Sequence, residues 1–161
     1  MDTWLTIASK RDHREYAPTP VPADVERRIL DAARLSGSSQ NRQKWEFVVV
    51  EQAKEELADA VYAPENVRTA ALVVALVGDA AGFDVGRASQ NMMLAAWNDG
   101  VASCPNGIAD ADAAARICGG EVKMILSFGY PANPRDVNRH TAEQWSARAK
   151  RLPLDELVRR V

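Results

Sequence analysis

The sequence predicts an α+β fold in a single domain that spans residues 1–161. Three observations lead to this prediction. Helical patterns intermix with short apolar runs that are typical of strands. The order of these patterns gives no regular strand–helix–strand rhythm, which favours helices packed over a central mixed or antiparallel sheet. A chain of 161 residues is also large enough for one domain with a substantial core.

The composition argues against several classes of function. The net charge is −2 and the basic clusters are short, so the sequence offers no surface for nucleic acid. No apolar stretch reaches the length of a membrane span, and the N-terminus lacks the pattern of a secretory signal. The two cysteines, Cys104 and Cys118, make no disulfide framework. We therefore expect a soluble, cytoplasmic protein with reduced thiols.

The N-terminal region predicts two helices joined by an extended connector. Residues 2–9 have apolar side chains at helical spacing. Residues 17–22 contain three prolines, which exclude a helix there. Pro22 suits the first position of the second helix, and Asp24 suits its first turn because a carboxylate complements the positive end of the helix dipole.

Three cations, Lys10, Arg11 and Arg14, follow the first predicted helix. One interpretation is structural, because basic side chains complement the negative end of a helix dipole. The other is an anion site. A helix C-terminus presents carbonyl groups, so a phosphate there would have to be held by side-chain charge, and arginine suits bidentate contact.

A polar loop segment at residues 36–41, SGSSQN, joins the second helix to a β-branched strand at Val48–Val50. Its short hydroxyl and amide side chains supply donors and acceptors with little steric hindrance. A strand directly behind such a loop would hold it in place, which suits a ligand site. An ordinary helix-to-strand connection uses the same residue types and is the alternative.

The remaining elements are predicted from apolar runs and from helix start and stop signals. We expect a charged helix at 51–61, a doubly covered strand at 71–77, a long helix at 83–100, a strand at 101–108 that contains a Pro105–Asn106–Gly107 turn, a helix at 110–118, a strand at 122–128, a polar tail to 144, a helical turn at 145–151 and a final apolar turn at 152–158.

The long predicted helix at 83–100 is apolar on nearly all sides. Asp84 suits its N-terminal cap, while Met93, Leu94 and Trp97 lie outside the main apolar face. A helix without a polar face is buried, and a chain of this size has little interior in which to bury it. We therefore expect a homodimer through the Asp84–Asp99 helix, with a central core helix of a monomer as the alternative.

Patterns for chemistry by protein side chains alone are absent from the sequence. The two histidines, His13 and His140, have no cysteines or carboxylates at metal-ligand spacing, so we expect no metal site. Neither a glycine-rich phosphate loop nor a serine-nucleophile elbow occurs. Cys104 has no neighbouring base and is expected to be a buried structural thiol. An enzyme with this sequence would need a cofactor to carry its chemistry.

Four segments in the same order resemble the nitroreductase family of FMN-dependent oxidoreductases. The segments are KRDHREY at 10–16, similar to the family's RRSxRxF; SSQNRQKW at 38–45, similar to SxxNxQPW; DVG, QNM and SC between 84 and 104; and GYP with RLPL between 129 and 154. The resemblance runs from about Ser9 to Leu157. It implies a three-layer arrangement, with a central sheet flanked by helices, in an intertwined homodimer.

The resemblance also implies FMN as the cofactor and NADH or NADPH as the co-substrate. The implied cofactor contacts are Lys10 and Arg11 at the phosphate and ribityl chain, Arg14 at the pyrimidine edge, Ser38, Ser39, Asn41 and Gln43 from the other subunit, Pro105, Asn106 and Gly107 near the flavin N5, and Arg151 at the phosphate with Lys150 as the second candidate. No side chain is implied as catalytic, because the flavin carries the chemistry and Arg14 tunes it.

The implied reaction transfers a hydride from NAD(P)H through the flavin N5 to a small organic acceptor, such as a nitroaromatic or a quinone, in two half-reactions. Asp12 stands where the family has serine, Lys44 where it has proline, and the region 51–84 is short where family members often build a substrate lid. These departures leave two alternatives: a flavin-dependent biosynthetic dehydrogenase that uses no nicotinamide, and a flavin-binding or cofactor-free dimer without turnover.

Overall fold

The computed structural model of the protein describes residues 2–161, which form two compact units. The larger unit comprises Arg11–Pro134. The smaller unit combines the N-terminal residues up to Lys10 with Arg135–Val161. Most of the regular secondary structure, including the whole sheet, belongs to the larger unit.

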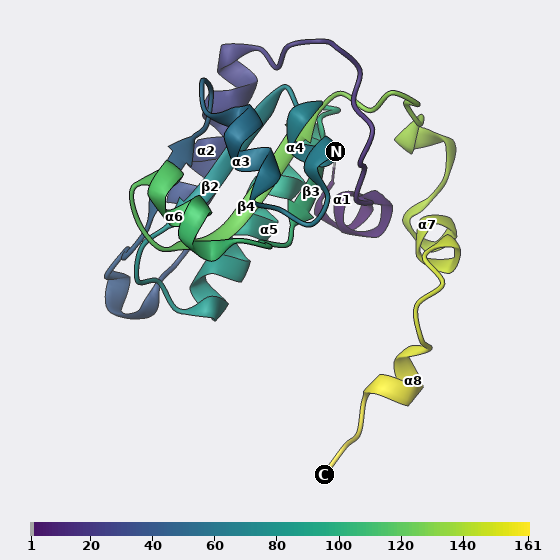
Figure 1. Cartoon of the computed structure of the whole chain (residues 1–161). Coiled ribbons are helices and arrows are strands. Elements are labelled where there is room, and N and C mark those ends of the chain that lie inside the picture. Colours follow the sequence, from purple (N-terminus) through teal and green to yellow (C-terminus); the bar gives the residue numbers. More distant parts are fainter. Residues whose placement is uncertain (1) are drawn as a thin grey trace. The chain divides into compact units, whose positions relative to one another are not determined.

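A four-stranded sheet forms the centre of the larger unit (Figure 1). In spatial order its strands are β1 (Glu46–Val49), β2 (Leu72–Val77), β4 (Val122–Gly129) and β3 (Ala102–Asn106). All three strand pairs are antiparallel. β2 is buried along its whole length, as its continuous apolar sequence predicts for a strand covered on both faces.

Helices cover both faces of this sheet (Figure 1). On one face, α2 (Ala23–Arg34) and α5 (Gly82–Asn98) pack over a core that includes Leu76, Leu126 and Phe128. Because side chains alternate along a strand, the neighbouring residues point to the opposite face. That face carries α3 (Lys54–Asp59), α4 (Pro64–Arg68) and α6 (Ala111–Cys118). The predicted α+β, three-layer fold class is confirmed.

Helix α5 is a core helix of the single chain. Met93 is 8% exposed and Trp97 is 5% exposed, so the chain itself covers these two side chains, whereas Leu94 is only half-buried. The expectation that a second copy must cover them is therefore wrong for Met93 and Trp97. The exposed residues of α5 include Gly86, Arg87 and Gln90 and also Phe83, which is 76% exposed, so the outer stripe of the helix is partly polar and partly apolar. The homodimer therefore stays a prediction that needs other support.

Two local predictions for the larger unit are also wrong. Asp84 does not cap α5, because the helix begins at Gly82 with Ala81 in the cap position. Pro105 and Asn106 belong to β3 rather than to a turn. β3 is an edge strand, and an edge tolerates proline because one side of the strand needs no backbone N–H for pairing.

The smaller unit contains α1 (Thr3–Ser9), the short 3-10 helix η2 (Val137–Arg139), α7 (Ala142–Arg148) and α8 (Leu154–Leu157). The expected polar tail to residue 144 is wrong, because α7 begins at Ala142 with a reciprocal capping box between Thr141 and Gln144. Trp145 is buried, and its indole N–H donates to the carbonyl of Val137 at 2.9 Å. No helix within residues 2–161 is long and apolar enough to cross a membrane.

Candidate functional site

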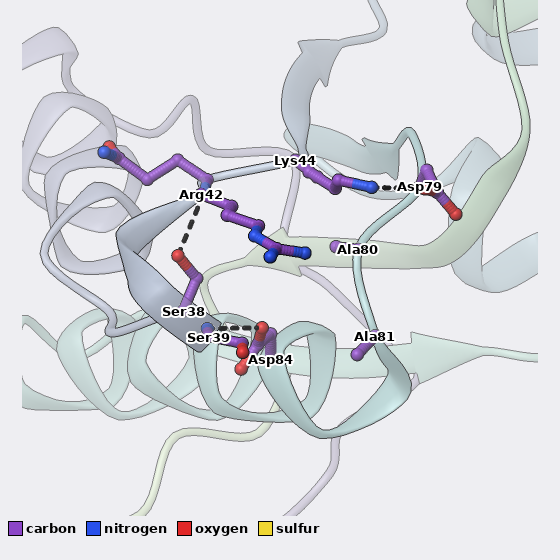
Figure 2. Close-up of a pocket in the computed structure, with 9 residues that line it drawn as sticks. Ser38, Ser39, Arg42, Lys44, Asp79, Ala80, Ala81 and Asp84 are labelled. Atoms are coloured by element: carbon purple, nitrogen blue, oxygen red, sulfur yellow. Dashed lines mark hydrogen bonds and ion pairs between the residues drawn. The ribbon is translucent and has the colours of Figure 1, made fainter.

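The polar segment between α2 and β1, here called loop 36–44, is attached to α5 at two points, and Figure 2 shows the attachment at Ser39. At its start, Asn91 Nδ2 donates to Ser36 Oγ at 2.7 Å. Further along, the backbone N–H of Ser39 donates to Asp84 Oδ2 at 3.1 Å. These bonds join the loop to one helix of the core, so it is a positioned structure rather than a free connection.

The backbone of loop 36–44 is strained. Gln40, Asn41 and Gln43 have φ values of 52°, 54° and 48°, a region that side-chain-bearing residues rarely adopt. A hydrogen bond from the Gln43 N–H to Ser38 Oγ, at 2.9 Å, closes the loop on itself. Strain of this kind persists where the surroundings impose it, and it is common at ligand sites.

A pocket of about 230 Å³ opens between loop 36–44 and the N-terminal end of α5 (Figure 2). It is lined by Ser38, Ser39, Arg42, Gln43, Lys44, Asp79, Ala80, Ala81 and Asp84. The Lys44 ammonium bonds to Asp79 at 2.8 Å and holds the pKa of that carboxyl below its usual value. The Arg42 guanidinium extends toward Ala80, so the walls carry charges of both signs.

The basic segment Arg11–Tyr16 runs along the free edge of β3. Asp12 forms an isolated parallel bridge with Ser103, and the N–H of His13 donates to the Ser103 carbonyl at 3.1 Å. The ring of His13 lies 5.6 Å from the ring of Trp97 on α5. Arg14 is exposed to solvent and Arg11 is half-buried.

A buried polar cluster lies beneath this segment and the end of β3. The hydroxyl of Tyr16 lies 3.0 Å from Ser127 Oγ, and Asn106 Nδ2 donates to Ser127 Oγ at 3.2 Å and to the Cys104 carbonyl at 3.1 Å. Burial raises the pKa of the Tyr16 phenol well above its usual value. Asn106 is 4% exposed, yet its Oδ1 accepts no hydrogen bond from any described residue.

The predicted site residues of the larger unit fall into two groups. Arg11 and Arg14 belong to the segment that bridges Ser103 and meets Trp97 near the C-terminal end of α5, and Pro105 and Asn106 follow Ser103 along β3, which Gly107 directly follows. Ser38, Ser39, Asn41 and Gln43 belong to loop 36–44, which meets Asp84. Asp84 and Trp97 are thirteen residues apart, a rise of about 20 Å along the helix. One chain therefore presents two separate half-sites.

The other three predicted site residues lie in the smaller unit. Lys10 directly follows α1 and is half-buried, and Lys150 and Arg151 are exposed just after α7. Lys150 has a φ of 53°. Their contacts with FMN stay predictions. Within residues 2–161, no group of three or more histidine, cysteine or carboxylate side chains could hold a metal ion.

Sequence reasoning missed the helix residues that hold loop 36–44. Asp84, Arg87 and Asn91 lie on one side of α5, at spacings of three and four residues. Arg87 packs its guanidinium over Gly37 and lies 3.9 Å from Asp84. The signal was present in the sequence as a polar row on an otherwise apolar helix.

Comparison with known proteins agrees with this architecture. The model of the nitroreductase family matches residues 7–81. The chain has the nitroreductase fold. A nitroreductase family protein from Streptococcus pneumoniae TIGR4 superposes with a TM-score of 0.84, at 17% identity, over 99% of this chain and 100% of that chain. An NADPH:FMN oxidoreductase from Vibrio harveyi, in complex with NAD⁺, superposes with a TM-score of 0.81, at 20% identity, over 96% of this chain and 75% of that chain.

A curated relative, an NADH dehydrogenase from Thermus thermophilus, is 33% identical over 81 residues. That match covers 49% of this chain and 40% of the relative, so the chain spans less than half of the relative's length. The resemblance to the nitroreductase family predicted from the four segments is confirmed by the family model and by the nitroreductase fold of the whole chain.

Proposed function

We propose that the protein is an FMN-dependent oxidoreductase that takes electrons from NADH or NADPH and passes them to a small organic acceptor. The observation that carries the proposal is the nitroreductase fold over nearly the whole chain, and the positioned polar loop and the basic segment beside β3 support it. The relatives from V. harveyi and T. thermophilus, described as an NADPH:FMN oxidoreductase and an NADH dehydrogenase, support this class of reaction.

The residues present fit FMN in their chemistry. A phosphate requires cations, and Arg11 and Arg14 supply guanidinium groups beside β3. The edge of the flavin ring carries amide-like donors and acceptors, which the exposed side chains of Asn41 and Gln43 can match. The unsatisfied Oδ1 of Asn106 marks a polar position beneath the end of β3. Asp12 is exposed and belongs to the same segment, so beside a phosphate it must either point away or form a salt bridge with an arginine.

When bound, FMN would supply the two-electron transfer that no side chain of this protein can perform. The residues of the chain would bind and orient it. Arg14, as a permanent cation, would favour the more negative reduced form over the oxidised form and so raise the reduction potential. Lys10 and Arg151, with Lys150 as an alternative, remain the candidates for additional charge at the phosphate.

The proposed enzyme is a homodimer, because loop 36–44 is attached at Asp84 while the basic segment lies against Trp97, about 20 Å further along α5. In a twofold arrangement, loop 36–44 of one copy can complete the basic half-site of the other copy. The outer stripe of α5 suits close helix contact, since Gly86 has open space around its Cα. The dimer would then be required to complete the flavin site.

The test is an anaerobic titration of the purified protein. FMN should bind with an absorbance spectrum that differs from that of free FMN, and NADH or NADPH should bleach it. A protein that binds FMN but reacts with neither nucleotide would favour a nicotinamide-independent dehydrogenase or a flavin-binding protein without turnover. A protein that takes up no FMN after incubation with excess cofactor would refute the proposal.

A further inference from the structure

The carboxylate of Asp84 has an unusual role for an acidic residue in the first turn of a long helix. Such a residue normally complements the dipole of its own helix. Asp84 is instead 7% exposed, and its Oδ2 accepts a hydrogen bond from the backbone of Ser39 in a different segment (Figure 2). A buried carboxylate is unfavourable unless it is hydrogen-bonded, so its burial depends on the loop as much as the loop depends on it.

Loop 36–44 needs such an anchor because its own conformation is unfavourable. Three of its non-glycine residues have left-handed backbone conformations, and the hydrogen bonds within the loop, among them those from the N–H groups of Gln43 to Ser38 Oγ and of Asn41 to the Ser38 carbonyl, are all local. Without Asp84, the loop would keep the bond from Asn91 at its start and the ion pair of Lys44 with Asp79 at its end but would lose its attachment at Ser39. The strained middle would then be free to relax into other backbone states.

We propose that Asp84 is a positioning residue that holds loop 36–44 in the shape required for the cofactor before the cofactor binds. This inference rests on the proposed function, in which Ser38, Ser39, Asn41 and Gln43 contact FMN. Asp84 acts through the Ser39 backbone and need not touch FMN itself. A loop that is already ordered loses less conformational entropy on binding, and this raises affinity without adding any contact.

The test compares three substitutions in the full-length protein. Asp84→Ala removes the acceptor for the Ser39 N–H, and Asp84→Asn keeps an acceptor oxygen without the charge. Asp99→Ala is the matched control, because Asp99 follows the other end of α5 and bonds to Arg28 at 2.8 Å, away from the loop. The measurements are amide hydrogen exchange at Ser39 and Gln43 without cofactor, the FMN dissociation constant from flavin fluorescence, and the visible circular dichroism of bound FMN.

We expect Asp84→Ala to speed exchange at both amides, to weaken FMN binding by roughly tenfold and to alter the dichroism of the bound flavin. Asp84→Asn should restore much of each property, and Asp99→Ala should leave all three as in the wild type. If Asp84→Ala does not fold, Asn91→Ala carries the comparison, because Asn91 is exposed and its loss releases the start of the same loop. That variant should weaken FMN binding severalfold.

Two negative results have different meanings. A wild-type protein that binds no FMN refutes the proposed function, whatever the loop does. A wild-type protein that binds FMN, together with Asp84→Ala that binds it equally well and exchanges its loop amides equally slowly, overturns the role of Asp84. A thermal unfolding curve for each variant separates loss of the fold from loss of the loop.

Discussion

Replacement of Gly78 by alanine should be among the most damaging single-methyl additions to this protein. Gly78 follows β2 directly and has a φ of +120°, where a residue with a Cβ is strongly disfavoured. An added Cβ would also lie 2.8 Å from the Lys44 carbonyl oxygen and 3.4 Å from the Trp45 Cα. Both neighbours are backbone atoms at the end of loop 36–44, so a small side-chain movement cannot relieve the contact.

The expected loss in the free energy of unfolding is the sum of the unfavourable backbone conformation and the steric contact. The unfavourable backbone region costs about 1–3 kcal/mol, and displacement of a backbone carbonyl adds to it, so about 3 kcal/mol in total is a reasonable expectation. For a protein of this size, a loss of 1 kcal/mol lowers the melting temperature by about 2–4 °C. Gly78→Ala should therefore melt about 6–12 °C below the wild type.

A graded series of glycine substitutions makes the measurement decisive. Gly119, which ends α6, has a φ of +79° but open space around it, so Gly119→Ala should cost only about 1 kcal/mol. Gly82, the first residue of α5, has open space and an ordinary φ, so Gly82→Ala should be close to neutral. The assay is urea unfolding followed by circular dichroism. Equal losses for Gly78→Ala and Gly119→Ala would refute the close approach of the Lys44 carbonyl.

Three further predictions concern the core, the cofactor and the dimer. Tyr16→Phe should lower the free energy of unfolding by about 1–2 kcal/mol through lost hydrogen bonds to Ser127. Because burial raises the pKa of the Tyr16 phenol, the contribution of Tyr16 to the free energy of unfolding is fully present below about pH 10 and is lost as the pH rises above that value. Urea unfolding at a series of pH values should therefore show a smaller loss of stability at alkaline pH for Tyr16→Phe than for the wild type. Arg14→Ala should lower the flavin reduction potential or weaken FMN retention. If neither the potential nor the retention changes, Arg14 does not tune or hold the flavin. Gly86→Gln should leave the single chain folded, because nothing lies within 4 Å of an added Cβ. The same substitution should convert the dimer to monomers, as measured by sedimentation. A dimer that stays stable would show that this face of α5 is not the dimer interface.

The sequence was sufficient for the parts of the fold that depend on local patterns. The continuous apolar run of β2 predicted a doubly covered strand, and the structure has it at Leu72–Val77. The helix predicted at residues 110–118 corresponds to α6, which Asp110 caps and Gly119 ends as the residue types suggest. In both cases the signal lies within a few neighbouring residues, so the sequence alone was sufficient to identify the element.

The wrong predictions mostly concern residues whose environment depends on segments far away in the sequence. Asp84 looked like a helix cap, but its partner is the backbone of Ser39, far away in the sequence. Met93 and Trp97 looked like interface residues, because the sequence does not reveal how much of α5 the same chain covers. The start of α7 was missed although the capping-box residues Thr141 and Gln144 were visible in the sequence.

The residue types of the candidate site were predictable from the sequence, but their arrangement in space was only partly predictable. The polar loop and the basic segment were both identified from the sequence, but their attachment to opposite ends of α5 depends on tertiary structure. That separation now gives the homodimer a geometric reason in place of the burial argument. The anchors Asp84 and Asn91 could not be assigned without knowing which segment lies against the helix.

The central claim, that two copies are needed to complete one flavin site, is tested most directly by sedimentation equilibrium monitored at the flavin absorbance. The account predicts that flavin sediments with a species of twice the 17.6 kDa chain mass, at one FMN per chain. Flavin that sediments with a single chain would contradict it, and so would a dimer that carries no flavin in the presence of excess FMN.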